Sequence, residues 1–216
     1  MANPGFFKKR EVWVPTWKGW LAGVLLVLSM FFLFVININS FLSPNSPVLD
    51  AEALLVDDWL PDYALNEALK EFNKQNYQKL IITGGQELFG WNATKYESTA
   101  ELLAAKLMER GVDSTKIRII KVKPDKKNRT EASSIATNEW LGGHPSGFCS
   151  INVISIGVHA RRSHYLFSKY LGDQYNVGII SIDNIAYDGD RWWKSSHGFK
   201  EVLTEFLAYL YTILLV

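Results

Sequence analysis

One histidine and two arginines stand together where a predicted strand turns into a predicted helix. The stretch INVISIGVHARRSHYLF, residues 151–167, begins with β-forming residues and places His159, Arg161 and Arg162 at its bend. An imidazole and two guanidinium groups this close repel one another unless a partner compensates their charge. An anion is the simplest partner, because arginine forms paired hydrogen bonds with phosphate or carboxylate oxygens. We therefore take Arg161 and Arg162 as ligand-binding candidates and His159 as a catalytic proton donor or acceptor.

Acidic and glycine residues follow two other predicted strands at the point where each strand ends. Asp57 and Asp58 close a first run of β-forming residues, and Gly84 and Gly85 close a second. Backbone N–H groups at a glycine-rich turn attract anions, although two glycines also suit a plain tight turn. We take Gly84 and Gly85 as ligand-binding candidates. Asp57 is a catalytic candidate that orients water or a metal ion, or acts as general base.

A third group, Arg129, Thr130 and Glu131, opens a predicted helix after the third strand. Helix N-termini attract anions, so Arg129 and Thr130 join the ligand-binding candidates and Glu131 joins the catalytic ones. The structural alternative is a threonine cap followed by a first-turn acid. The single cysteine, Cys149, has no metal-ligand spacing, so we assign no metal ligand, and the residues indicate no particular cofactor.

Strands and helices alternate along the chain after residue 50. The expected strands are residues 51–58, 79–85, 116–122, 150–157 and 175–183, and the expected helices are residues 61–76, 96–111, 130–143, 161–172 and 199–216. This alternation predicts an α/β fold that is Rossmann-like and doubly wound, with a mainly parallel sheet of five strands. Because ligands bind outside the carboxyl ends of such strands, we expect the candidates to surround one positively charged hollow.

An apolar segment precedes this domain. Residues 19–49 contain no charged residue, and the apolar residues 19–38 are long enough to span a bilayer as a helix, at 1.5 Å per residue. A basic cluster precedes them, which indicates a cytoplasmic N-terminus. We divide the chain into a cytoplasmic basic N-terminus (1–18), a transmembrane helix (19–38), a polar linker (39–50) and an extracytoplasmic α/β domain (51–216). A cleaved signal peptide is the alternative, but the apolar run ends without a small-residue cleavage site.

The last predicted helix is strongly apolar after Glu205. Its uninterrupted apolar part is too short to cross a bilayer. We expect it to pack against the core, with contact at the membrane surface as the alternative. For Trp192 and Trp193, just before this helix, we expect packing against the sheet rim or the membrane.

The order and spacing of four motifs resemble those of the bacterial YdcF/SanA/ElyC-like family. The motifs are LIITGG, STAELLAAKLMERGV, NRTEA and VHARRS, within residues 51–183. The last is the most specific, and it places His159, Arg162 and Ser163 at the strand-to-helix bend. The resemblance implies a Rossmann-like domain with a membrane-anchored layout. It also implies a role in envelope or cell-wall processes, including peptidoglycan and its lipid-carried precursors.

The formal net charge of +1 gives no field that favours nucleic acid, so we expect no nucleic-acid partner. The first hypothesis is a single-pass protein of the plasma (inner) membrane that binds an anionic small molecule or lipid-linked glycan precursor, as a hydrolase or transferase on a phosphorylated or pyrophosphate substrate. The second is a non-catalytic envelope factor that senses an anion and docks onto envelope-synthesis proteins. A nucleotide or S-adenosylmethionine site is a third, but no G-x-G-x-x-G follows the first strand.

Overall fold

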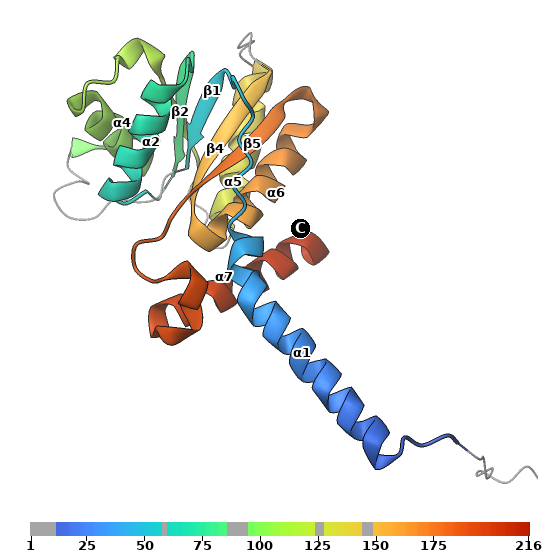
Figure 1. Cartoon of the computed structure of the whole chain (residues 1–216). Coiled ribbons are helices and arrows are strands. Elements are labelled where there is room, and N and C mark those ends of the chain that lie inside the picture. Colours follow the sequence, from blue (N-terminus) through green and yellow to red (C-terminus); the bar gives the residue numbers. More distant parts are fainter. Residues whose placement is uncertain (1–11, 58–59, 86–94, 124–127, 144–148) are drawn as a thin grey trace, which may run out of the picture. The chain divides into compact units, whose positions relative to one another are not determined.

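The computed structural model describes residues 12–57, 60–85, 95–123, 128–143 and 149–216. The chain separates into two compact units, residues 1–37 and 38–216. Helix α1 (Trp17–Leu42) forms the first unit and continues into the second (Figure 1). Its 26 residues cover about 39 Å, and among the described residues it is the one helix long and apolar enough to cross a membrane. The predicted span, residues 19–38, lies within it.

Five strands in the described part of the chain form one sheet, and every pair in it is parallel (Figure 1). The strands are β1 (Ala53–Val56), β2 (Lys79–Gly84), β3 (Ile117–Lys121), β4 (Ser150–Ile156) and β5 (Asn176–Ile182). Their order is β3-β2-β1-β4-β5, so the direction of winding reverses between β1 and β4. Sequence analysis predicted this Rossmann-like sheet, and the structure confirms it. Ligand sites of such sheets lie outside the carboxyl ends of the strands at the reversal.

Helices cover both faces of the sheet, which is why its central strand β1, ALLV, is apolar and buried throughout. On one face, α2 (Asp62–Lys74) and α4 (Thr99–Glu109) pack against Leu54 and Val56 of β1. On the other face, α5 (Arg129–Gly143) and α6 (Ala160–Leu171) enclose a cluster with Ala53 and Leu55 of the same strand. Alternate side chains of a strand point to opposite faces, so the four residues of β1 contribute to both cores.

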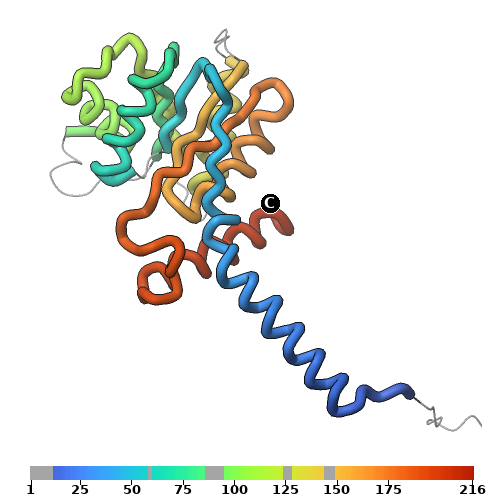
Figure 2. Tube along the Cα trace, in the orientation of Figure 1, coloured from blue at the N-terminus to red at the C-terminus, as the bar shows by residue number. Residues whose placement is uncertain are grey.

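A sharp turn joins β4 to α6 and carries His159. The turn is the 3₁₀ segment η2 (Gly157–His159), and α6 follows without a break (Figure 2). Gly157 has φ +44°, a left-handed conformation that residues with a Cβ rarely adopt. The sequence IGVHARR therefore turns directly from strand into helix, and it places His159 at the carboxyl edge of the sheet.

The predicted linker, residues 39–50, is bound to the domain over part of its length. Helix α1 continues to Leu42, which is fully buried. Ser46 forms an antiparallel bridge with Ile179 of β5, and the backbone N–H and carbonyl of Val48 bond to the side chain of Asn152. The chain thus enters the domain at the end of α1 and lies along the sheet before β1.

Helix α7 (Ser196–Leu215) ends the chain after the 3₁₀ segment η4 (Gly189–Lys194). It begins three residues earlier than predicted, where the Ser195 hydroxyl caps the helix by accepting from Gly198 N. The expected core packing is limited, because only three of the 20 residues of α7 are buried: Gly198, Val202 and Thr212. Trp192 is buried against Trp193 and Phe199, whereas the Trp193 side chain stays partly exposed.

Candidate functional site

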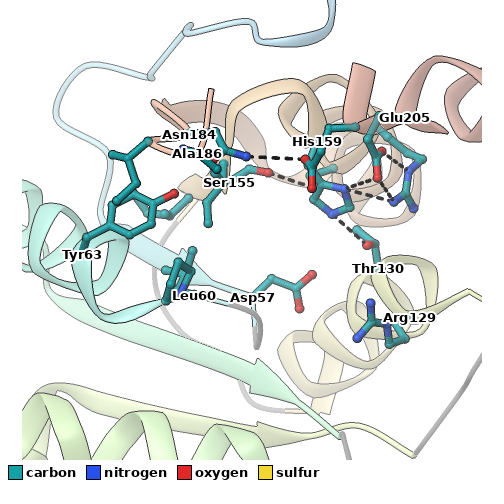
Figure 3. A pocket seen from close by; sticks show the side chains of 17 residues that line it. Asp57, Leu60, Tyr63, Arg129, Thr130, Ser155, His159, Asn184, Ala186 and Glu205 are labelled. Carbon is teal, nitrogen blue, oxygen red and sulfur yellow. Dashed lines mark hydrogen bonds and ion pairs between the residues drawn. The ribbon is translucent and has the colours of Figure 1, made fainter. Parts of the chain in front are cut away.

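A cavity of about 500 Å³ lies at the carboxyl ends of β1 and β4, where the strand order reverses. Figure 3 shows the side chains around it. It is lined by Asp57, Leu60, Pro61, Tyr63, Arg129, Thr130, Ile154, Ser155, Ile156, His159, Arg162, Ser163, Asn184, Ile185, Ala186, Glu201 and Glu205. These residues come from the ends of β1, β4 and β5, the first turns of α2, α5 and α6, and one side of α7.

His159 has a polar neighbour at each ring nitrogen. Nε2 lies 3.3 Å from the hydroxyl of Thr130, in the first turn of α5. Nδ1 lies 3.2 Å from Glu205 Oε1 and 3.0 Å from Arg162 Nη2 (Figure 3). A proton on Nδ1 would be donated to Glu205, whereas a bare Nδ1 would accept from Arg162. The ring is thus held by both nitrogens while a third of the side chain remains exposed, a suitable arrangement for moving a proton.

Glu205 and Arg162 form a two-point ion pair between α7 and α6. Arg162 Nε donates to Oε2 at 3.0 Å, and Nη2 donates to Oε1 at 3.2 Å. Burial raises the pKa of Glu205, but the hydrogen bonds and positive charges of His159 and Arg162 outweigh burial and lower it to about 2. Glu205 is therefore ionised at neutral pH, and it compensates the charge of Arg162.

Asp57 accepts two hydroxyl hydrogen bonds at one carboxylate oxygen. Thr83 Oγ1 of β2 donates to Oδ1 at 2.9 Å, and Ser133 Oγ of α5 donates to the same atom at 2.8 Å. These bonds orient the carboxylate at the end of β1, beside Arg129 and Thr130 (Figure 3). A carboxylate has several lone pairs, so Asp57 can also accept a proton or a further donor.

Five of the predicted site residues line one cavity. They are Asp57, Arg129, Thr130, His159 and Arg162. They are far apart in sequence, and the shared carboxyl edge of the sheet brings them together. Asp58, which sequence analysis placed beside Asp57, lies outside the described residues.

Arg161 and Glu131 lie outside the cavity lining. Arg161 donates from Nε to the carbonyl of Phe41 at 2.7 Å, and its guanidinium lies 4.4 Å from the centre of the Phe41 ring. Glu131 accepts a hydrogen bond from the hydroxyl of Tyr170 and so joins α5 to α6. Each is the neighbour in sequence of a lining residue, and the helix turns the two side chains of each pair to different sides.

Gly84 and Gly85 also lie outside the lining. Gly84 is the last residue of β2, and its carbonyl accepts from Val122 N at 3.2 Å. A Cβ at Gly85 would stand 1.8 Å from the carbonyl oxygen of Val122. The glycines thus allow the end of β2 to approach the chain that follows β3. This packing role agrees with the alternative that the two glycines form a plain tight turn.

The chain matches no protein-family model and no curated protein sequence. The resemblance to the YdcF/SanA/ElyC-like family therefore stays a prediction.

Sequence analysis missed the lining residues of α7. Glu201 and Glu205 are four residues apart, so they lie on one helix face, but they stand in a segment dominated by apolar residues. The four-residue spacing of these two glutamates was the one sequence signal that could have indicated a shared site. Asn184 directly follows Asp183, the residue expected at the end of the fifth strand. Tyr63, in the first turn of α2, gave no signal beyond its place after β1.

The lining carries both charge signs. Its described residues include three carboxylates, two guanidinium groups and one imidazole, so the formal charge is −1 with a neutral imidazole and 0 with a charged one. The expected positive bias is therefore absent from the described lining as a whole. Arg129 and His159 stand at one end, beside the first turns of α5 and α6, together with the carboxylates of Asp57 and Glu205 (Figure 3). No group of three His, Cys, Asp or Glu residues suited to a metal ion occurs among the described residues.

Proposed function

We propose that α1 anchors the chain in the plasma (inner) membrane with a cytoplasmic N-terminus. We further propose that the cavity binds an anionic, phosphorylated ligand and acts in cell-wall metabolism on a peptidoglycan or lipid-linked glycan precursor. The observation that carries the second proposal is the convergence of Arg129, Thr130 and His159 with two helix N-termini at the reversal of the strand order.

The phosphate would bind at the end of the cavity that holds Arg129. The first turns of α5 and α6 line this end, and α6 continues there from the 3₁₀ turn, with the Ala160 N–H bonded to the carbonyl of Gly157. Helix dipoles add partial positive charge there, and Arg129, whose guanidinium group can form paired hydrogen bonds with phosphate oxygens, lines the same end. Arg162 contributes less than sequence analysis expected, because Glu205 compensates its charge.

The rest of the ligand would extend toward Tyr63, Leu60 and Asn184, which stand at the other end of the cavity (Figure 3). A phenol, an amide and the carboxylate of Glu201 bind hydroxyl groups, and Leu60 and Ile185 offer an apolar wall. A phosphorylated sugar has this combination of an anionic end and a hydroxyl-rich end.

His159 and Asp57 suit acid–base chemistry on such a ligand. In hydrolysis, water attacks the phosphorus atom and the bond from phosphorus to the leaving oxygen breaks. Asp57 takes a proton from the water, and a protonated His159 delivers one to the leaving oxygen. Glu205 stabilises the protonated ring through Nδ1, which leaves Nε2 as the donor.

The test uses the full chain in lipid nanodiscs and a lipid-linked pyrophosphate as probe, with binding and phosphate release measured separately. Arg129→Ala should weaken binding about tenfold to a hundredfold, since a hydrogen bond to a charged group contributes about 1.5–3 kcal/mol. His159→Ala should retain binding and lose turnover by about 100-fold or more. Arg118→Ala and His164→Ala, which remove the same side chains outside the cavity lining, are the matched controls.

The two readouts separate the hypotheses. Binding without turnover in the wild type would favour the non-catalytic envelope factor. Equal binding of the probe to wild type and Arg129→Ala would show that the cavity is not the anion-binding site.

A further inference from the structure

The second half of α7 presents an apolar face outside the domain. After Glu205, residues 206–216 contain no charged side chain. Leu207, Tyr211 and Leu214 follow at spacings of four and three, so they lie on one helix face. Their exposed fractions are 64%, 51% and 74%, and Leu215 beside them is 73% exposed. A face this apolar is costly in water, which indicates a partner.

The opposite side of the same helix serves the cavity. Glu201 and Glu205 line it, and Glu205 holds Arg162 and contacts His159. The first half of α7 is thus bound by polar contacts to the site, while the second half leaves an apolar surface uncovered. The two halves have different surroundings within one continuous helix.

The position of α7 identifies the partner. Its Tyr209 ring packs edge-on against Phe41, with 5.8 Å between the ring centres. Phe41 is the penultimate residue of α1, the helix long enough to span a membrane. Leu42 is already fully buried in the domain, so no spacer separates the end of α1 from it. An element that touches Phe41 therefore lies at the level where α1 leaves the hydrocarbon.

The neighbouring side chains suit that level of a bilayer. Partly exposed aromatic residues, Trp193, Phe199 and Tyr211, occur on η4 and α7, and aromatic rings favour the headgroup region. The guanidinium of Arg161 lies against the Phe41 ring, where anionic headgroups are within reach. Residues 206–216 cover about 16 Å as a helix, too short to cross the bilayer but long enough to lie along its surface.

We infer that the second half of α7 lies in the interface of the bilayer that α1 spans, with Leu207, Tyr211 and Leu214 turned toward the acyl chains. This inference rests on the proposed anchoring by α1, and it adds a second membrane contact beside the cavity.

Spin-label accessibility of the full chain in proteoliposomes tests it. Cys149 is replaced by serine, and single cysteines are introduced in separate chains at Leu28, Leu214 and Lys74, all exposed in the structure. The Leu28 label reports on the anchor, and the Leu214 label reports on α7. Lys74 is the water control, because the end of α2 leads to the amino end of β2, opposite the cavity edge.

The expected result is frequent collision with oxygen and rare collision with a water-soluble nickel chelate at Leu28 and Leu214, and the reverse at Lys74. A lipid-exposed Leu28 with a water-exposed Leu214 would overturn the placement of α7 and leave the anchor intact. Magnetic broadening between the Leu214 labels of two copies would show that a second copy of the chain, rather than the bilayer, covers this face. That result too would overturn the inference. A water-exposed Leu28 would overturn the anchor and the inference together.

Discussion

Glu205 binds the guanidinium of Arg162 through both carboxylate oxygens, at 3.0 and 3.2 Å. The side chains of both residues are 18% exposed, and Glu205 Oε1 also lies 3.2 Å from Nδ1 of His159. Glu205 of α7 thus contacts and orients two residues at the turn from β4 into α6. Glu205 also compensates the charge of Arg162, one of the two arginines that sequence analysis took as ligand-binding candidates at this turn.

The lowered pKa of Glu205 predicts a pH dependence of stability. Its pKa falls from 4.5 to about 2 on folding, so the ion pair stabilises the folded state fully above pH 4.5. That stabilisation is lost as pH falls through 2. The shift corresponds to a contribution on the order of 3 kcal/mol to the free energy of unfolding. Glu205→Gln should be less stable by about this amount at pH 7, and the difference from wild type should shrink as the solution is acidified.

Chemical unfolding in detergent micelles at several pH values measures this difference. Glu67→Gln is the control, because Glu67 pairs with Lys70 on the exposed surface of α2. It should change the free energy of unfolding by less than about 1 kcal/mol. A pH-independent difference between wild type and Glu205→Gln would contradict the predicted role of the pair.

Thr130 is predicted to position His159. Its buried hydroxyl lies 3.3 Å from Nε2, the nitrogen that faces the proposed phosphate end. Thr130→Val keeps the shape and removes the hydroxyl, so it should lower turnover of the lipid-linked probe about tenfold or more. Thr130→Ser keeps the hydroxyl and should restore most of the turnover. Equal losses in the two variants would indicate that only packing matters.

Gly85 is predicted to serve packing rather than ligand binding. An added Cβ would overlap the Val122 carbonyl, so Gly85→Ala should destabilise the domain by about 1–3 kcal/mol or more. Gly142→Ala is the matched control: a Cβ there would meet no atom within 4 Å beyond its chain neighbours and the backbone of its own helix, and alanine favours the helix. Thermal unfolding compares the two variants. Binding of the probe to folded Gly85→Ala should match binding to wild type. A loss of binding in the folded variant would instead indicate that the glycines contact the ligand.

Asn152 is predicted to secure the segment between α1 and β1. Its fully buried side chain accepts from Val48 N at 2.8 Å and donates to Val48 O and Tyr77 Oη at 3.0 and 2.9 Å. Asn152→Leu leaves these groups without their partner, at a cost of about 1–3 kcal/mol each. Hydrogen exchange at the Val48 amide should accelerate strongly, while exchange at the β1–β2 ladder changes less. Unchanged protection of Val48 would show that other contacts hold this segment.

Much of the site could be predicted because several of its residues follow the carboxyl ends of strands in one sheet. Asp57, Thr130 and His159 each follow a strand, and the carboxyl ends of parallel strands share one edge. Local patterns are enough to find strand ends, so these residues could be assigned to one cavity before any contact was known.

Neighbouring residues on one helix could not be separated in the same way. Arg161 and Arg162 differ by about 100° around the axis of α6, so one can face the cavity while the other faces the end of α1. The packing positions of α1 and α7 decide which arginine faces the cavity. The sequence around the turn from β4 into α6 does not specify those positions. The same holds for Thr130 and Glu131 at the start of α5.

The sequence by itself determined the alternation of strands and helices, the apolar segment that forms α1, and the set of side chains at the carboxyl edge. These follow from periodicity and chain order, which are local properties. Only the tertiary structure decided that Glu205 neutralises Arg162, that Arg161 binds the end of α1, and that the cavity carries mixed charge. Each of these depends on the docking of α7 or α1 against α6, and such a contact between distant segments is set by packing of the whole domain.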